Sequence, residues 1–155
     1  MLWNRHKALA PIIQVRDSIY LNWRYLGIPE FNYRPFAIIW KGELAGYIVL
    51  RLMNLMGYNF GVLVDIFPFP LKDNKLTKYV FQFARDYAKA NKAEFLTCLL
   101  PWEKNCFWRK IGYLKIPEFL NPRTWYFGYR SLGNENPLLD RLQNWYLSYG
   151  DTDIV

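Results

Sequence analysis

The sequence predicts an α/β fold with a mixed, mostly antiparallel sheet flanked by helices. Two observations predict it. Apolar and β-branched runs joined by tight-turn residues fill the stretch from Phe36 to Phe67, which is typical of antiparallel strands. A helical period follows, and then a short apolar run over residues 95–100 completes a strand–helix–strand unit.

The N-terminal half is predicted to be a helix followed by an antiparallel meander. Asp17 is a suitable N-cap for a helix over residues 17–25, which Gly27 and Pro29 end. Strands are expected at 36–40, 44–52 and 58–67. Lys41-Gly42 and residues 54–57 supply the turns between them.

The period changes after the third strand. Apolar residues then recur at three- and four-residue spacing, at Leu76, Val80, Phe83, Ala84, Tyr87 and Ala88. This spacing predicts an amphipathic helix with Asp73 or Asn74 as its N-cap. The run at 95–100 is bounded by Pro101, and we expect it to lie parallel to strand 58–67.

Three further elements are expected in the last third of the chain. A helix over 103–111 ends at Gly112, and a late strand covers 124–129. Asn136-Pro137 opens a last helix over 137–148, with proline at its favoured first position. The whole chain, 1–155, is predicted to be one domain with a core over about 36–130.

Composition limits the classes of function. Hydrophobic residues make up 52% of the 155 residues and charged residues 21%, as in a globular domain. Aromatic residues reach 19%, so they either form a Trp- and Tyr-rich core or also line a groove or partner surface. The net charge is +7, but Lys and Arg are scattered, which argues against nucleic-acid binding and is compatible with an anionic cofactor.

Neither a metal site nor a membrane span is expected. The two cysteines, Cys98 and Cys106, make no disulfide framework, and with the single histidine, His6, they lack the spacing of zinc ligands. No apolar run approaches the length of a membrane span. We therefore expect a cytoplasmic protein.

The order of the predicted elements resembles that of the GNAT acyltransferases. Residues 107–113, Phe-Trp-Arg-Lys-Ile-Gly-Tyr, resemble the aromatic-aromatic-x-Lys-aliphatic-Gly-aromatic segment that ends the helix after the family's parallel strand. Asp17 with residues 20–25, and residues 149–153, resemble the flanks of the C-terminal half of tandem GNAT-like proteins. Those proteins are associated with polysaccharide or cell-envelope biosynthesis.

The resemblance implies two alternative functions. The first is an N-acyltransferase that moves an acyl group from acetyl-CoA or another acyl-CoA to an amino group of a sugar, peptide or small molecule. The second is a non-catalytic GNAT-like half that binds substrate or completes a tandem two-domain transferase. A second GNAT-like half or a second copy of the chain is the expected partner.

The resemblance also implies where a cofactor would bind. Strand amides at Ile66 and Phe67 would meet the pantetheine, and the start of the next helix would hold the pyrophosphate. The residues implied for that second contact are Lys72, Asn74, Lys75 and Leu76. This loop contains no glycine, and Asp73 would repel a phosphate, so the alternative is a loop that only connects strand and helix.

Three residues are candidates for proton transfer. Trp108 stands where the family usually has the tyrosine that protonates the leaving thiolate, so Tyr113 and Tyr126 are candidate substitutes, with simple packing as the alternative. Asp65, inside an apolar strand, is a candidate base, or it accepts hydrogen bonds that shape the strand end. Cys98 is expected to be a core residue rather than an acyl carrier.

Two pairs of polar residues near the chain ends are predicted to have a structural role. Trp23-Arg24 and the acidic residues 151–153 are expected to lock the termini onto the domain, or onto a missing first half.

Overall fold

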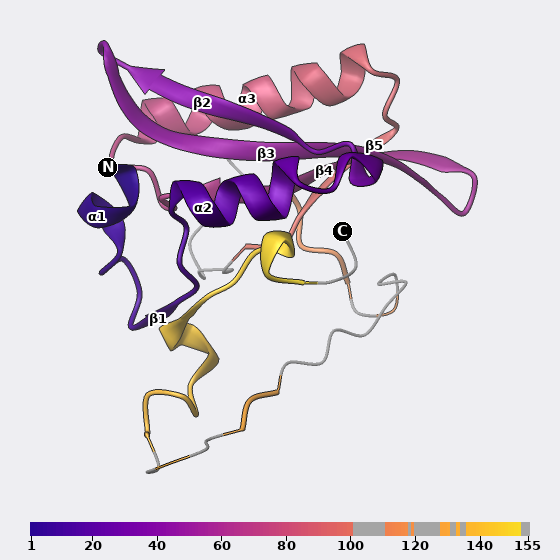
Figure 1. Cartoon of the computed structure of the whole chain (residues 1–155). Helices are drawn as coiled ribbons and strands as arrows, with labels where there is room; N and C mark the ends of the chain where they lie inside the picture. Colours follow the sequence, from indigo (N-terminus) through magenta and orange to yellow (C-terminus); the bar gives the residue numbers. More distant parts are fainter. Residues whose placement is uncertain (101–110, 118, 120–127, 131–132, 134–135, 153–155) are drawn as a thin grey trace.

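A four-stranded sheet forms the middle layer of the computed structural model (Figure 1), which describes residues 1–100, 111–117, 119, 128–130, 133 and 136–152. The strand order is β2-β3-β4-β5, and the strands are β2 (Arg34–Trp40), β3 (Glu43–Leu55), β4 (Tyr58–Phe67) and β5 (Phe95–Cys98). Neighbours are antiparallel except β4 and β5, which run parallel. The predicted mixed α/β class is confirmed.

Two tight turns fix the register of the meander. Lys41 and Gly42 have φ of 52° and 82°, and Met56 and Gly57 have φ of 53° and 84°. Positive φ at both central residues is typical of the two-residue hairpin turn that matches strand twist. The turns predicted at these positions are confirmed.

Helix α3 (Asn74–Ala90) covers one face of the sheet (Figure 1). The predicted cap is confirmed, since the Asp73 side chain accepts from the Lys75 N–H at 2.7 Å. The buried stripe is rotated relative to the predicted one. Thr77 and Phe81 are buried, although the predicted stripe does not include them. Phe83 is 43% exposed and Tyr87 is half-buried, and both rings pack against Phe36 of β2.

The opposite face is covered by short elements from both ends of the chain (Figure 1). These are α1 (Leu2–His6), α2 (Ser18–Leu21) and its π-helical continuation η1 (Asn22–Leu26), followed by η2 (Pro29–Phe31). The predicted cap Asp17 accepts from the Tyr20 N–H at 2.9 Å. Near the C-terminus, β6 (Trp145–Tyr146) pairs in parallel with β1 (Ile12–Ile13), and η5 (Tyr149–Asp151) follows.

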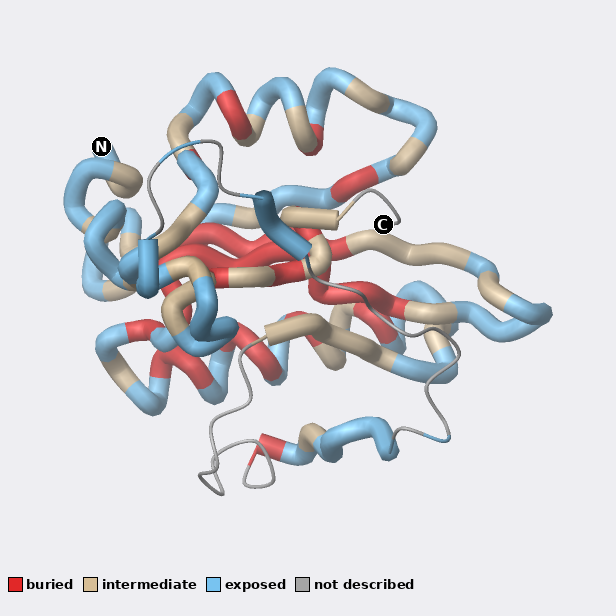
Figure 2. The backbone as a smooth tube through the Cα atoms, turned by 90° about the horizontal axis from the view of Figure 1, so that it is seen from below, coloured by how far each residue is buried: buried red, intermediate tan, exposed pale blue. Residues whose placement is uncertain are grey.

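The burial of the backbone is greatest in the middle strands (Figure 2). In β4, every residue from Gly61 to Phe67 is buried, as expected for a strand covered on both faces. The close approach of α3 to β4 needs a glycine, because a Cβ on Gly61 would lie 2.8 Å from the Cβ of Ala88.

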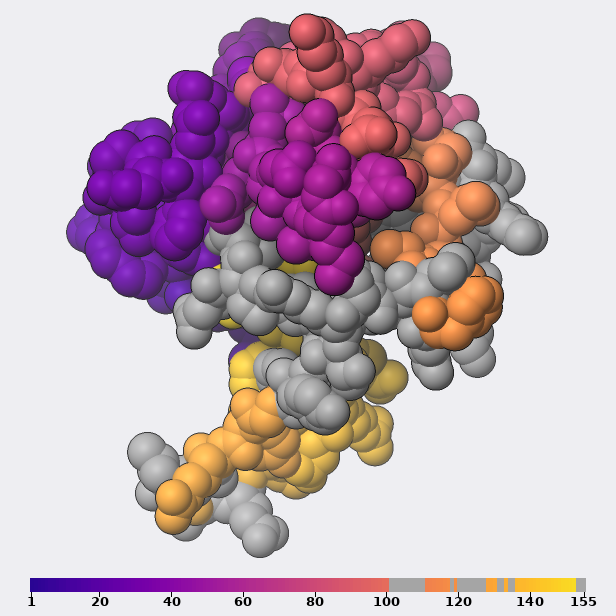
Figure 3. All heavy atoms as spheres, turned by 90° about the vertical axis from the view of Figure 1, so that its right-hand side faces the viewer, coloured from indigo at the N-terminus to yellow at the C-terminus, as the bar shows by residue number. Residues whose placement is uncertain are grey.

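The prediction of a helix over 137–148 is wrong. Residues 137–140 form a turn, η4 (Leu142–Asn144) is a single 3-10 turn, and β6 is extended. Leu138 and Leu142 are exposed, so the helical spacing of these residues does not mark a buried face. This segment projects from the body of the molecule in Figure 3 before extended backbone brings Tyr146 and Ser148 to β4.

Two other predicted elements lie largely outside the described residues. They are the helix over 103–111, of which only Ile111 is described, and the strand over 124–129, of which only Gly128 and Tyr129 are described, outside any strand. Gly112 has φ of 83°, as expected for the residue that would end such a helix.

Candidate functional site at the end of strand β4

Strand β4 extends beyond its pairing with β5. The parallel pairing ends at Leu63 and Cys98, while β4 continues to Phe67. The register between β3 and β4 shifts at the same place, so Val64 has no partner in that ladder. An extra residue of this kind bends a strand and re-aims its backbone groups. Residues 64–67 of β4 therefore extend past the end of β5.

Both backbone polar groups of Ile66 are engaged within the chain. The Ile66 N–H donates to Asp65 Oδ1 at 3.0 Å, and the Ile66 carbonyl accepts from the hydroxyl of Tyr146. Burial raises the pKa of Tyr146 well above its usual range, so this hydroxyl remains a donor. At the strand edge that the resemblance assigns to pantetheine, the contact is made by the chain's own β6.

Asp65 lies at the centre of a buried polar cluster. Its Oδ2 accepts from the hydroxyls of Tyr47 at 2.7 Å and Tyr25 at 3.0 Å, and its Oδ1 accepts from the hydroxyl of Ser148 at 2.9 Å. The Arg16 Nε lies 3.2 Å from Oδ2. We call these five residues and Asp151 the Asp65 cluster. A carboxylate with so many donors suits the structural alternative better than proton abstraction from a substrate.

Arg16 joins the two carboxylates of the cluster. Its Nη2 donates to Asp151 Oδ2 at 2.6 Å and to Ser148 Oγ at 3.3 Å, and its Nη1 donates to the Gln14 carbonyl at 3.1 Å. Burial opposes the charge of Arg16, but Asp65 and Asp151 outweigh it, so the pKa of Arg16 is raised. The guanidinium also lies 4.8 Å from the ring centroid of Tyr146.

The two tyrosines of the cluster act as neutral donors. Burial raises the pKa of Tyr25 and Tyr47, and the negative charge of Asp65 raises both further. Neither phenol therefore ionises near neutral pH, and both hydroxyls remain available to the Asp65 carboxylate.

The prediction that polar residues lock the termini onto the domain is confirmed for Arg24 and Asp151. The Arg24 side chain donates to the carbonyl of Gly150 at 3.0 Å and to the carbonyl of Thr152. Asp151 joins the Asp65 cluster through Arg16. Residues 153–155 lie outside the described part of the chain.

The residues implied for cofactor binding differ in their exposure to solvent. The side chains of Phe67 and Leu76 are buried in the core, whereas Lys72, Asn74 and Lys75 are exposed. The Lys75 N–H is already used by the Asp73 cap. The two lysine side chains and Asn74 are therefore the members of this set that face solvent, and the loop between β4 and α3 packs its own Phe69 and Leu71 inward.

Of the remaining candidates for chemistry, Tyr113 and Cys98 are described, and neither is among the hydrogen-bond partners of Asp65. Tyr113 packs edge-on against Phe81 with ring centroids 5.2 Å apart, and burial, with smaller effects of neighbouring charges, raises its pKa. Burial raises the pKa of the Cys98 thiol to about 12, so a thiolate is disfavoured at neutral pH. Tyr126, Trp108 and Cys106 lie outside the described residues.

Two cavities flank α1. One, of about 500 Å³, is lined mainly by apolar residues of α1, α2, β2 and β3, and Arg16, Tyr25 and Tyr47 of the Asp65 cluster form part of its wall. The other, of about 360 Å³, lies between α1, the β2–β3 turn and the loop before α3, and several basic residues line it. Within the described ranges, no His, Cys, Asp or Glu group is arranged to hold a metal, and no helix is long and apolar enough to cross a membrane.

Sequence reasoning misses most of the Asp65 cluster. Arg16, Tyr25, Tyr47 and Ser148 lie in four separate segments, and Arg16 and Ser148 are 49 and 83 positions away from Asp65. One signal was available: an aspartate inside an apolar strand requires donors. Nothing in the sequence indicates which donors these are.

Comparisons with known proteins identify the fold but no family. A scan against protein-family models finds no match, and a search of curated proteins finds no similar sequence. Among solved structures, a probable acetyltransferase matches with a TM-score of 0.53 and 14% identity over 73% of this chain and 76% of that one. An integron cassette protein from the mobile metagenome of Cole Harbour Salt Marsh matches with a TM-score of 0.45 and 21% identity. That match covers 71% of this chain and just under two thirds, 66%, of the cassette protein.

Proposed function

We propose that this chain is a non-catalytic GNAT-like half that binds substrate for, or completes, a tandem two-domain transferase. The observation that carries the proposal is the place of the C-terminal segment. The hydroxyl of Tyr146 donates a hydrogen bond to the Ile66 carbonyl, and the hydroxyl of Ser148 donates one to Asp65. Both contacts lie at the end of β4, where an acyl-CoA-dependent enzyme of this fold would receive its cofactor.

The polar contacts of Asp65 support the same proposal. A general base needs an oxygen that can reach the substrate proton. Arg16, Tyr25 and Tyr47 instead surround this carboxylate, which is fully buried. In this proposal Asp65 holds the chain ends against the sheet, and chemistry belongs to the other half of the transferase.

The likeness to a probable acetyltransferase supports the acyltransferase setting of the proposal, and the flanking motifs add its context. On that basis the proposed setting is polysaccharide or cell-envelope biosynthesis in the cytoplasm. The acceptor would carry an amino group on a sugar, peptide or small molecule.

A second candidate is N-acyl transfer from acyl-CoA by this chain alone. Two observations favour it: the register shift at Val64, just past the end of the pairing with β5, and the exposed Lys72 and Lys75 on either side of the start of α3. A strand amide whose direction is changed by the register shift is suited to bond a carbonyl of the cofactor. Lysines beside the start of a helix are suited to bind a phosphate.

Thermal unfolding with acetyl-CoA and with coenzyme A separates the two candidates. A ligand that binds only the folded state at about 100 times its Kd adds about 2.7 kcal/mol of stability and raises Tm. We expect millimolar acetyl-CoA to leave Tm at the value measured with inorganic pyrophosphate at matched ionic strength, because the pantetheine edge is engaged by Tyr146. A clear rise in Tm above that control would favour the second candidate.

A further inference from the structure

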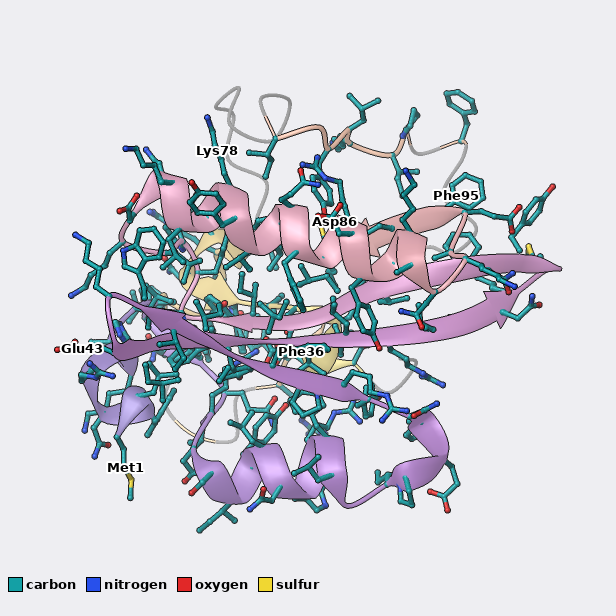
Figure 4. The ribbon with its side chains drawn as sticks, turned by 90° about the horizontal axis from the view of Figure 1, so that it is seen from above. Met1, Phe36, Glu43, Lys78, Asp86 and Phe95 are labelled. Atoms are coloured by element: carbon teal, nitrogen blue, oxygen red, sulfur yellow. The ribbon has the colours of Figure 1, made fainter. Side chains whose placement is uncertain are left out.

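The cavity of about 360 Å³ beside α1 collects basic residues from three separate elements. Arg5 comes from α1, Lys41 from the β2–β3 turn, and Lys72 from the loop before α3. Figure 4 shows Glu43 at the same corner of the molecule as Met1 and α1. We call this space the α1 cavity.

Among the described residues, none of β4 or β5 lines the α1 cavity, which is formed by α1, β2, β3, the segment that leads from β4 into α3, and the start of α3. The cavity shares Lys72 and Leu76 with the set implied for coenzyme A. Arg5, Lys41 and Trp40 lie outside that set. What the cavity binds goes beyond the proposed function, in which this chain is a non-catalytic half.

The acidic residues of the α1 cavity do not cancel its basic residues. Asp73 Oδ1 accepts from the Lys75 N–H at 2.7 Å, so this carboxylate is committed to the start of α3. Glu43 is exposed, as are Arg5, Lys41 and Lys72, so one free carboxylate faces three positive charges at this cavity. Arg5 is held in place because its Nη2 donates to the carbonyl of Leu44 at 2.8 Å, a bond that uses one of its five N–H donors.

His6 reports the sign of the potential at the cavity wall. Burial lowers the pKa of His6, and the charges of Lys72 and Arg5 lower it further. The nearby charges that act on the imidazole are thus positive, although Glu43 and Asp73 line the same cavity. A positive potential of this kind favours an anion.

Trp40 gives the cavity an apolar wall beside these charges. Its ring is half-buried and lies 6.1 Å from that of Tyr79, and the His6 ring is edge-on to Phe67 with centroids 6.1 Å apart. A half-buried indole presents a flat face to a sugar or another ring. The volume lies within the range of small-molecule sites, about 300–1,000 Å³.

We propose that the α1 cavity binds the phosphate group of a small phosphate monoester whose ring lies against Trp40. Arg5, Lys41 and Lys72 meet the phosphate, which carries about −1.5 to −2 charge at neutral pH. Among these three basic residues, Arg5 and Lys72 are the ones whose positive charges lower the pKa of His6. The ring contact with Trp40 distinguishes a sugar phosphate from inorganic phosphate.

The single histidine makes the test direct, because the imidazole Hε1 resonance of His6 is unique in the proton NMR spectrum of the full chain. We expect inorganic phosphate, at constant ionic strength, to shift this resonance saturably and to raise the pKa of His6, since the anion offsets Lys72 and Arg5. Glucose 1-phosphate should saturate at lower concentration, and glucose should cause no shift.

Three variants show whether the binding is specific. Lys72→Ala should weaken binding of phosphate by roughly five- to tenfold. Lys78→Ala removes the same charge from an exposed position of α3 that does not line the cavity, and should leave binding unchanged. Trp40→Ala should weaken glucose 1-phosphate but not inorganic phosphate.

The proposal is overturned if phosphate causes no saturable shift of His6, or if Lys72→Ala and Lys78→Ala weaken binding equally. Equal affinities for glucose 1-phosphate and inorganic phosphate would show that Trp40 does not contact the ring of the ligand. Acetyl-CoA itself carries a ribose 3′-phosphate monoester, so the thermal measurement is repeated with Trp40→Ala. A rise in Tm that persists in this variant belongs to the end of β4, and a rise that is lost belongs to the α1 cavity.

Discussion

The two faces of the central sheet are covered in different ways (Figures 1 and 2). On one face, a single helix, α3, packs apolar side chains such as Phe81 and Ala84 against the strands, and both are fully buried. On the other face, short terminal elements are held by the Asp65 cluster, in which the partners of Asp65 come from four other segments of the chain.

This difference shows what each face depends on. Apolar burial is non-directional, so the α3 face needs the right volume more than particular partners. A buried polar cluster needs every partner in place, because removing one leaves another unpaired in the interior. We therefore expect the terminal face to be more sensitive to changes that preserve side-chain size.

The largest effect is expected from Asp65→Asn. The change keeps the shape of the side chain but leaves Arg16 with a weakened partner in the interior, so the free energy of unfolding should fall by about 3–5 kcal/mol. Urea denaturation measures it. Asp86→Asn on the exposed side of α3 is the matched control and should change stability by less than about 0.5 kcal/mol. A similar small loss for both variants would refute the central place of Asp65.

A smaller effect is expected on the α3 face from Gly61→Ala. The new methyl group would lie 2.8 Å from the Cβ of Ala88, and overpacking of this kind costs about 1–3 kcal/mol. In the double variant with Ala88→Gly, the two losses should be less than additive, because the clash is relieved. Strict additivity in a double-mutant cycle of urea unfolding would mean that α3 and β4 do not approach this closely.

Tyr146→Phe tests the contact between β6 and the end of β4. Losing the donor to the Ile66 carbonyl should reduce the free energy of unfolding by about 1–2 kcal/mol. Tyr79→Phe, at a tyrosine that is 63% exposed, serves as the comparison and should be close to neutral. If both variants unfold at the wild-type denaturant concentration, the contact with Ile66 contributes nothing to stability.

The smallest effect concerns the pH dependence that Asp151 contributes. Burial raises the pKa of Asp151 in the folded state, and Arg16 only partly opposes this. Its Oδ1 is buried with no hydrogen-bond partner among the described residues, which agrees with that direction. A raised folded-state pKa of an acid contributes stability below the unfolded pKa, and this contribution is lost as pH rises through the folded pKa.

The unfolding free energies of wild type and Asp151→Asn are compared over a pH range. As pH falls from neutral through the folded-state pKa of Asp151 to below its unfolded-state pKa, wild type should become more stable relative to Asp151→Asn. Subtracting the two curves cancels the titration of the other groups. A difference that grows instead as pH rises would contradict the direction given for Asp151.

The contrast between the faces also explains what the sequence could predict. Local patterns specify the hairpin turns at Lys41-Gly42 and residues 54–57, the caps Asp17 and Asp73, and the period of α3, and all of these are confirmed. They depend on neighbours within a few residues along the chain. The buried stripe of α3 is rotated toward Thr77 and Phe81 and away from Phe83, because packing against the sheet selects the face of the helix.

The terminal face depends on non-local contacts, and there the prediction is weaker. The apolar spacing of Leu138, Leu142 and Trp145 resembles a helix, but the bonds of Tyr146 and Ser148 to β4 require extended backbone and override that preference. The apolar neighbours of Asp65 in the sequence mark this carboxylate as unusual. Its partners Arg16, Tyr25 and Tyr47 are brought to it only by the folded topology.

The chain's own C-terminal segment holds the end of β4 through Tyr146 and Ser148, at the place where the second candidate function would need acyl-CoA to bind. Amide hydrogen exchange with and without saturating acetyl-CoA tests it most directly, read on peptides that cover residues 64–76 and 145–152. If the segment holds the end of β4, both regions exchange slowly and adding acetyl-CoA changes neither. Slower exchange at 64–76 together with faster exchange at 145–152 would show instead that acetyl-CoA displaces the segment.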